Sequence, residues 1–146
     1  ANNIVNAILW DKSNTAKESG VTLDCDASLS NDIPVDDVDL CCLIVNMLDN
    51  AIRGAKAAES DKSISIKIKE ENGRIYISVS NYADMPDFES TEKLPSTKAN
   101  KNHGYGTEII RNIVQKYDGD VLFTCKDRKF STALSIRKGE REIENI

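Results

Sequence analysis

Two asparagines and an arginine lie one helical turn apart within a predicted amphipathic helix. Asn46, Asn50 and Arg53 stand at positions i, i+4 and i+7, so they share one stripe beside the apolar face of that helix. An asparagine carbonyl is a neutral oxygen ligand, which suits a hard cation such as Mg²⁺ that phosphates and water already hold. Arg53 can pair with phosphate oxygens. The other interpretation is that the two asparagines are ordinary polar residues at a helix edge.

Asn81 comes directly after the apolar positions of a predicted core strand. Its side-chain carbonyl can accept a hydrogen bond from an adenine amino group. The alternative is an asparagine that caps the strand end or starts a turn.

The segment His103, Gly104, Tyr105, Gly106 and Thr107 leads straight into a predicted helix. Glycines let the backbone approach a phosphate closely, and a helix N-terminus presents unpaired N–H groups with partial positive charge. His103 is the only histidine of the chain. We interpret it as a phosphate or lid contact, with a simple loop residue as the alternative.

The elements that must position these side chains follow from the apolar periodicity. Tight-turn signals at Asn72-Gly73 and Asp127-Arg128 join neighbouring strands into hairpins. Strands paired in this way, with helices between them, predict an α+β two-layer sandwich. The expected order is a helix over 4–17, a strand over 21–27, a helix over 37–58 that Asp36 or Asp37 caps, a hairpin over 64–79, a short helix ending near 117 and a hairpin over 121–136.

The stretch from Asn81 to His103 has no periodic apolar pattern. About 20 residues without regular structure in a compact domain indicate a functional lid or a disordered segment. We expect the part from about Asp84 to Lys101 to be mobile. Lys98 is the best candidate in it for closing on a phosphate, although such lysines are also typical of a solvated loop.

Composition excludes several classes of function. The chain has 146 residues, a net charge of −5 and a pI near 4.9, which argues against a nucleic-acid surface. No apolar run approaches the roughly 20 residues needed to cross a bilayer, so we expect no membrane insertion by this chain. Four cysteines without a CxxC pair, with one histidine, give little support for zinc and indicate reduced thiols in the cytosol.

The order of these segments resembles the ATP-binding domain of sensor histidine kinases, in the superfamily shared with DNA gyrase, 90-kilodalton heat-shock chaperones and mismatch-repair ATPases. The closest resemblance is to the accessory-gene-regulator-type, peptide-sensing subgroup. The segments that carry it are NMLDNAI (46–52), similar to the N box; SVSNY (78–82), similar to the adenine-binding box; LPSTK (94–98), similar to the segment before the lid; HGYGTEIIRNIVQKYDGDV (103–121), similar to the glycine box and its helix; and STALSI (131–136), similar to the closing strand.

This resemblance implies a Bergerat-type sandwich, with a mixed, mostly antiparallel sheet covered by helices on one face and with a flexible ATP lid. It implies ATP and Mg²⁺ as ligands, with Asn50 at the metal. The nucleotide-binding residues that it implies are Asn46, Asn50, Arg53, Asn81, Met85, Lys98, His103, Gly104, Tyr105, Gly106, Thr107 and Thr132.

It further implies that the γ-phosphate goes to a histidine on an upstream dimerisation domain, with a response regulator as the next partner. Residues 1–20 then form a linker or the end of that upstream helix, and residues 21–146 form the catalytic domain. Trp10 on the first helix either contacts a partner or packs on the domain. The whole resembles the cytoplasmic part of a membrane-bound parent protein.

Three departures from the family pattern bear on activity. Where the adenine-binding box has Asp-x-Gly-x-Gly, this chain has Asn81, Ala83 and Met85, and Gly54 stands where many kinases have an aromatic residue. A catalytically degenerate regulatory module of the same fold is therefore the alternative. A water-using ATPase is disfavoured, because Asn46 replaces the glutamate that such enzymes use and an amide has no useful basicity.

Overall fold

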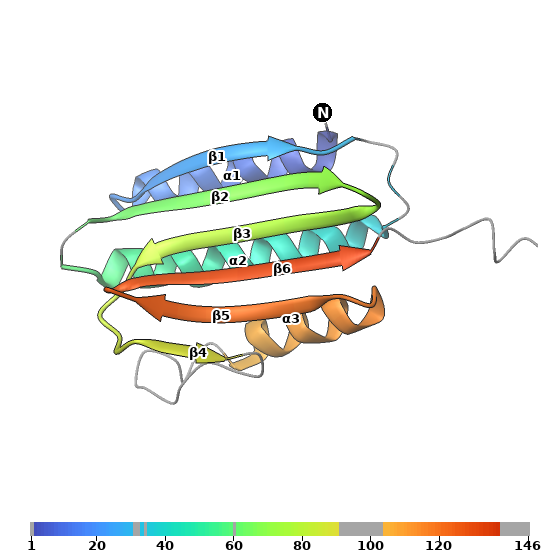
Figure 1. Cartoon of the computed structure of the whole chain (residues 1–146). Coiled ribbons are helices and arrows are strands. Elements are labelled where there is room, and N and C mark those ends of the chain that lie inside the picture. The colour runs from blue at the N-terminus through green and yellow to red at the C-terminus, as the bar shows by residue number, and fades with distance from the viewer. Residues whose placement is uncertain (1, 31–32, 34, 60, 91–103, 138–146) are drawn as a thin grey trace, which may run out of the picture.

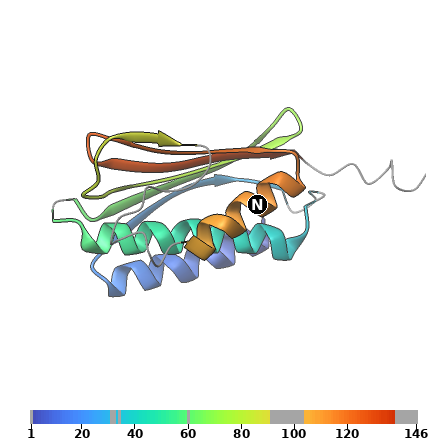
Figure 2. The same cartoon turned by 90° about the horizontal axis from the view of Figure 1, so that it is seen from below.

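The computed structural model describes residues 2–30, 33, 35–59, 61–90 and 104–137. In this part of the chain a six-stranded sheet, in the order β1-β2-β3-β6-β5-β4, carries three helices on one face (Figures 1 and 2). Only β1 and β2 are parallel, and every other neighbouring pair is antiparallel. The predicted two-layer sandwich is confirmed. The elements are α1 (Asn3–Glu18), β1 (Thr22–Ser28), α2 (Asp37–Ala57), β2 (Ser63–Glu71), β3 (Arg74–Tyr82), β4 (Phe88–Ser90), α3 (Gly104–Lys116), β5 (Asp120–Lys126) and β6 (Lys129–Arg137).

The long helix α2 is the centre of the helical layer. Asp36 caps it, because its carboxylate accepts hydrogen bonds from the backbone N–H groups of Val38 and Asp39. The apolar side chains that recur every three or four residues are buried against the sheet and against α1 and α3. They are Leu40, Leu43, Ile44, Met47, Leu48, Ala51, Ile52 and Ala55.

Two tight hairpins set the register of the central strands. Asn72 and Gly73 join β2 to β3 with φ angles of 52° and 77°, and Asp127 and Arg128 join β5 to β6 with φ angles of 53° and 67°. Two central residues with positive φ are typical of the hairpin turn that matches the twist of the strands. Both predicted hairpins are confirmed, and their turns put alternate residues of each strand on the helical face.

The first helix, α1, packs on α2 and on β1. Val5, Leu9 and Ala16 are buried in the same core as the rest of the domain. The Nζ of Lys12 lies 2.7 Å from Oδ1 of Asp49 and ties the two helices together. Trp10 points outward and is 72% exposed, so the alternative that it packs on the domain is wrong. The division of the chain after residue 20 stays a prediction.

Parts of the expected lid belong to the sheet, so the expectation of a stretch without regular structure from residue 81 is wrong for residues 81–82 and 88–90, whereas residues 83–87 form no helix or strand. Strand β3 continues to Tyr82, and β4 pairs antiparallel with β5 at the sheet edge. Three residues are too few for an alternating apolar pattern to be visible in the sequence. The rest of the predicted lid, with Lys98 and His103, lies outside the described residues.

A polar cluster joins the start of α2 to the end of α3. The hydroxyl of Tyr117 donates to Oδ2 of Asp39 at 2.7 Å and accepts from the backbone N–H of Asp36 at 3.0 Å. The Nζ of Lys116 donates to the same Oδ2 at 2.7 Å. These hydrogen bonds, first from Lys116 and then from Tyr117, hold the pKa of Asp39 below its ordinary value.

The first prediction concerns the acid stability of this cluster. Because the pKa of Asp39 is lowered by folding, its stabilisation is complete above the unfolded pKa near 4 and is lost as the pH falls through the folded pKa. We expect Asp39→Asn to cost about 1 kcal/mol at pH 7. We also expect it to flatten the loss of stability between pH 5 and pH 3, as measured by urea unfolding. Asp37→Asn, an exposed neighbour on the same helical turn, is the control and should keep the wild-type acid profile.

Candidate functional site

The polar stripe of α2 consists of Asn46, Asn50 and Arg53, next to the apolar face of this helix. Asn46 and Asn50 are half-buried, and Arg53 is exposed. The Nδ2 of Asn46 donates to the carbonyl of Cys42 at 2.7 Å, within the same helix. This bond orients the amide so that its oxygen serves as the acceptor. The predicted alignment of the three residues on one helix is confirmed.

Asn81 is the polar end of an otherwise apolar row of residues on β3. Only 3% of the residue is exposed. Its Nδ2 donates to the carbonyl of Tyr82 at 3.0 Å, while its Oδ1 is fully buried and has no hydrogen-bond partner. The amide is therefore held with its carbonyl oxygen as an unused acceptor.

Gly54 of α2 lies directly against this amide. A Cβ built on Gly54 would be 2.7 Å from Nδ2 of Asn81, which is closer than such atoms approach in proteins. The sequence showed that Gly54 lacks the aromatic side chain of many kinases, but not that it makes room for Asn81. That contact joins residues 27 positions apart on different elements, and no local pattern indicates it.

Two threonines are buried on the same side of the sheet as Asn81. Thr132 of β6 is opposite Val79 of β3, two residues along from Asn81, and so faces the helices as well. Thr107 lies in the first turn of α3, and only 5% of it is exposed. Its Oγ1 is buried without a hydrogen-bond partner. Strands β3 and β6 are neighbours and α3 packs on α2, so these elements all border the same interlayer region.

The side chains of the described residues leave two buried polar atoms unpaired, and both are oxygens at predicted site residues, Asn81 and Thr107. Each such atom costs about 1–3 kcal/mol, because it gives up water without gaining a partner. Proteins pair the great majority of their buried polar groups, so an unpaired one needs an explanation. A ligand that forms hydrogen bonds with both oxygens would explain why neither has a partner within the protein.

The remaining predicted site residues divide into those placed and those not described. Met85 is half-buried and packs against the core. The segment from Gly104 to Gly106, predicted to lead into a helix, already forms the first turn of α3. The unpaired N–H groups of that turn remain at the helix start. Lys98 and His103 lie outside the described residues.

Within the described ranges, no group of three or more His, Cys, Asp or Glu side chains could hold a metal ion. All four cysteines are free thiols. None of the helices in the described part of the chain is long and apolar enough to cross a membrane.

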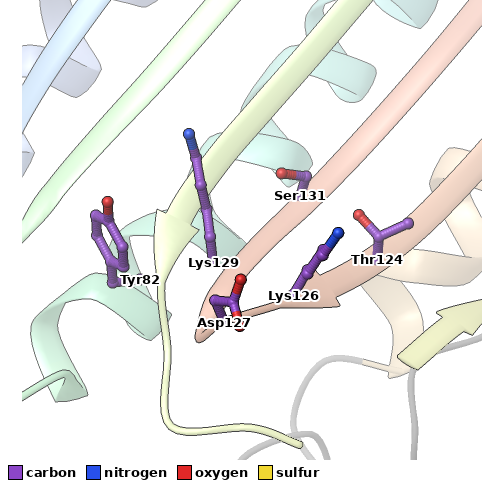
Figure 3. A pocket seen from close by; sticks show the side chains of 6 residues that line it. All are labelled: Tyr82, Thr124, Lys126, Asp127, Lys129 and Ser131. Atoms are coloured by element: carbon purple, nitrogen blue, oxygen red, sulfur yellow. The ribbon is translucent and has the colours of Figure 1, made fainter. Parts of the chain in front are cut away.

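A separate open hollow of about 400 Å³ lies at the hairpin end of β5 and β6 (Figure 3). Its strand residues alternate with the buried ones, so it opens on the sheet face that points away from the helices. It contains none of the predicted site residues. The residues that line it are Tyr82, Thr124, Lys126, Asp127, Lys129 and Ser131.

Comparisons with known proteins place most of the chain in one family. The model of a family described as "GHKL domain" matches residues 35–137. No curated protein matches the chain in sequence. The solved structures described next are only 14–16% identical to this chain, so their likeness shows the fold alone.

Three solved structures share the fold. The catalytic domain of histidine kinase ThkA, in a nucleotide-free form, has a TM-score of 0.70 at 14% identity, with 94% of each chain covered. Full-length ShkA in complex with AMPPNP has a TM-score of 0.69 at 16% identity, with 93% of this chain and 29% of that chain covered. Histidine kinase AdeS of Acinetobacter baumannii has a TM-score of 0.66 at 14% identity, with 94% and 64% covered. The chain thus spans 29% of ShkA and 64% of AdeS.

The second prediction concerns the unpaired hydroxyl of Thr107. Valine has nearly the shape of threonine, so Thr107→Val removes an unpaired buried polar group without creating a cavity. We expect the variant to be more stable than the wild type by about 1 kcal/mol in thermal or urea unfolding. The same change at Thr15, whose exposed hydroxyl donates to the carbonyl of Asp11 at 3.2 Å, is the control and should give no gain. A destabilised Thr107→Val would show that the hydroxyl has a partner in the unliganded protein.

Proposed function

Because the chain belongs to the GHKL domain family, we propose that it binds Mg·ATP and acts as the catalytic domain of a protein-histidine kinase. In this proposal the γ-phosphate goes to a histidine on a separate helical domain. The observation that carries the proposal is the buried, unpartnered Oδ1 of Asn81 on the helical face of the sheet. The amide Nδ2 is already used by the carbonyl of Tyr82, so the oxygen is oriented to accept from a ligand.

The base end of the site is built around Asn81. An exocyclic amino group on a purine supplies the donor that Oδ1 lacks, and adenine carries such a group. Thr132 lies on the neighbouring strand and on the same face as Asn81, and Met85 packs against the core four residues after Asn81; both are proposed contacts of the base. Asn81 stands where the family's adenine-binding box has aspartate, and this supports our proposal that the chain belongs to the accessory-gene-regulator-type subgroup.

The phosphate end of the site lies between α2 and the start of α3. The backbone N–H groups of Gly104 to Gly106 and the hydroxyl of Thr107 offer hydrogen bonds to phosphate oxygens. Arg53 offers positive charge, and Asn46 a second amide on the same stripe. Lys98 and His103 are proposed contacts on the basis of the sequence alone.

Asn50 is the proposed magnesium ligand. Its neutral amide oxygen suits a hard cation that phosphates and waters already coordinate, and no carboxylate cluster among the described residues offers a competing site. Bound Mg²⁺ would supply charge neutralisation for the phosphates. The protein's own contribution is to orient the amide at the edge of the site.

The acceptor of the phosphoryl group lies outside this chain in our proposal. Asn46 has no basicity with which to activate water, whereas a histidine that attacks directly needs only positioning and charge neutralisation. We therefore propose an upstream dimerisation domain, connected through α1, as the first partner and a response regulator as the second. The exposed Trp10 on α1 is a suitable contact for the former. The parent protein is proposed to be membrane-bound, with this part in the cytoplasm.

The third prediction tests magnesium-dependent binding. Calorimetric titration of the wild-type chain should show binding of ATP that Mg²⁺ strengthens, with a gain in stability of about 2.7 kcal/mol at 100 times the Kd. Asn50→Ala should lose the effect of Mg²⁺ on affinity while its stability stays within about 0.5 kcal/mol of the wild type. Asn112→Ala, an exposed asparagine on α3, is the control and should bind normally. Absence of binding by the wild type at millimolar nucleotide would refute the proposed function.

The fourth prediction is that the chain alone neither phosphorylates itself nor hydrolyses ATP appreciably. Its single histidine adjoins the phosphate end of the site in sequence, and Asn46 lacks the general-base help that is worth roughly 10²–10⁴-fold. Incubation with γ-labelled ATP should label an added upstream helical region of the parent protein but not this chain. Acid-labile label on this chain that His103→Ala abolishes would overturn the interpretation of His103 as a phosphate or lid contact. Rapid turnover of ATP that is lost on changing Asn46 would favour an ATPase.

A further inference from the structure

Four strands place a row of side chains next to Asn81. Register pairs Asn81 of β3 with Phe130 of β6, Phe130 with Cys125 of β5, and Cys125 with Phe88 of β4. Residues that are directly opposite in neighbouring strands share one face of the sheet. Asn81 contacts Gly54 of α2, so the whole row is on the helical face.

The row has one polar member with an aromatic residue beside it. Directly opposite residues have Cβ atoms roughly 5 Å apart, so the ring of Phe130 is in reach of any group that hydrogen-bonds to Asn81. On the other side of Asn81 stands Ile64 of β2, which is fully buried in the core. Thr132 is on the Phe130 side. A ligand at Oδ1 of Asn81 that also reaches the site threonine therefore lies over β6 rather than over β2.

Phe88 supports Phe130 from the sheet edge. The two rings stack across Cys125 with centroids 6.2 Å apart and an interplanar angle of 28°. The Sγ of Cys125 lies 3.8 Å from the carbonyl oxygen of Met85, which fixes the chain between β3 and β4 against the same row. Phe130 is 8% exposed, so its position is determined by packing rather than by solvent.

We propose that Phe130 is a specificity-determining residue, whose ring contacts the purine base that hydrogen-bonds to Asn81. This inference rests on the proposed function and adds the apolar surface that the base needs. Gly54 offers no side chain to the base from α2, so the aromatic contact comes from the sheet instead. Phe88 is a positioning residue that holds the Phe130 ring.

The test compares Mg·ATP, which carries a purine base, with Mg·tripolyphosphate, which does not. We expect Phe130→Leu to raise the Kd for Mg·ATP about tenfold, because stacking of a base on an aromatic ring is worth about that factor or more. The Kd for Mg·tripolyphosphate should stay within about twofold of the wild-type value. Phe130→Tyr keeps the ring and should restore binding of Mg·ATP.

Phe123→Leu is the matched control. Phe123 is a fully buried ring on the same face of β5, one row away and opposite Thr132. Its loss should destabilise the fold but leave the ratio of the two Kd values unchanged. An equal change of that ratio in Phe123→Leu and Phe130→Leu would overturn the inference, as would a folded Phe130→Leu with the wild-type ratio. If the wild type binds no Mg·ATP, the proposed function itself fails.

A measurement on the wild type covers the case in which Phe130→Leu does not fold. With phenylalanine rings assigned by NMR, nuclear Overhauser contacts between the adenine protons of bound Mg·ATP and the Phe130 ring are expected. Contacts only to other rings or to aliphatic side chains would overturn the inference, while binding of Mg·ATP would still stand.

Discussion

The approach of α2 to β3 at Gly54 sets the depth of the interlayer region on which the rest of the site depends. With any larger residue at position 54, a Cβ would meet the amide of Asn81 at 2.7 Å, and either the helix or the amide would have to move. Beside this contact, Nδ2 of Asn81 donates to the carbonyl of Tyr82, and Oδ1 remains a buried acceptor. It also fixes the height of Asn50 above the sheet, because Asn50 lies one turn back on the same rigid helix.

The two ends of the α2–α3 pair are stabilised differently. At the start of α2, Asp39 and Tyr117 satisfy each other's polar groups and join α3 to α2. At the start of α3, Thr107 leaves its hydroxyl buried and unpaired. A protein selected for stability alone would replace that hydroxyl with a methyl group, whereas a ligand-binding site keeps the donor for the ligand. This contrast supports the proposed site at the start of α3.

The chemistry that these residues can supply is mainly positional and electrostatic. The described site offers neutral amides, hydroxyls, one arginine and the N-terminus of α3, and it lacks a carboxylate or imidazole at the position of Asn46. Such groups bind and orient a nucleotide but do not activate water. Transfer to an acceptor that another domain presents therefore agrees with this set of side chains better than hydrolysis does.

The sequence by itself determined every helix and strand except β4, because each of the others is encoded locally. The three- and four-residue spacing of apolar positions predicts α2, and the Asn72-Gly73 and Asp127-Arg128 turns predict the hairpins that the structure confirms. It also placed Asn46 and Asn50 on one helical stripe. Strand β4 was missed, because three residues carry no readable period.

Tertiary structure alone decided which of these residues meet. The contact between Gly54 and Asn81, and the row from Phe88 through Phe130 to Asn81, join residues from separate elements through helix packing and strand register. The unpaired state of Thr107 likewise follows from what surrounds α3, not from its own sequence. Periodicity determines which face of an element is buried, but the partners on that face depend on how the elements are placed against one another.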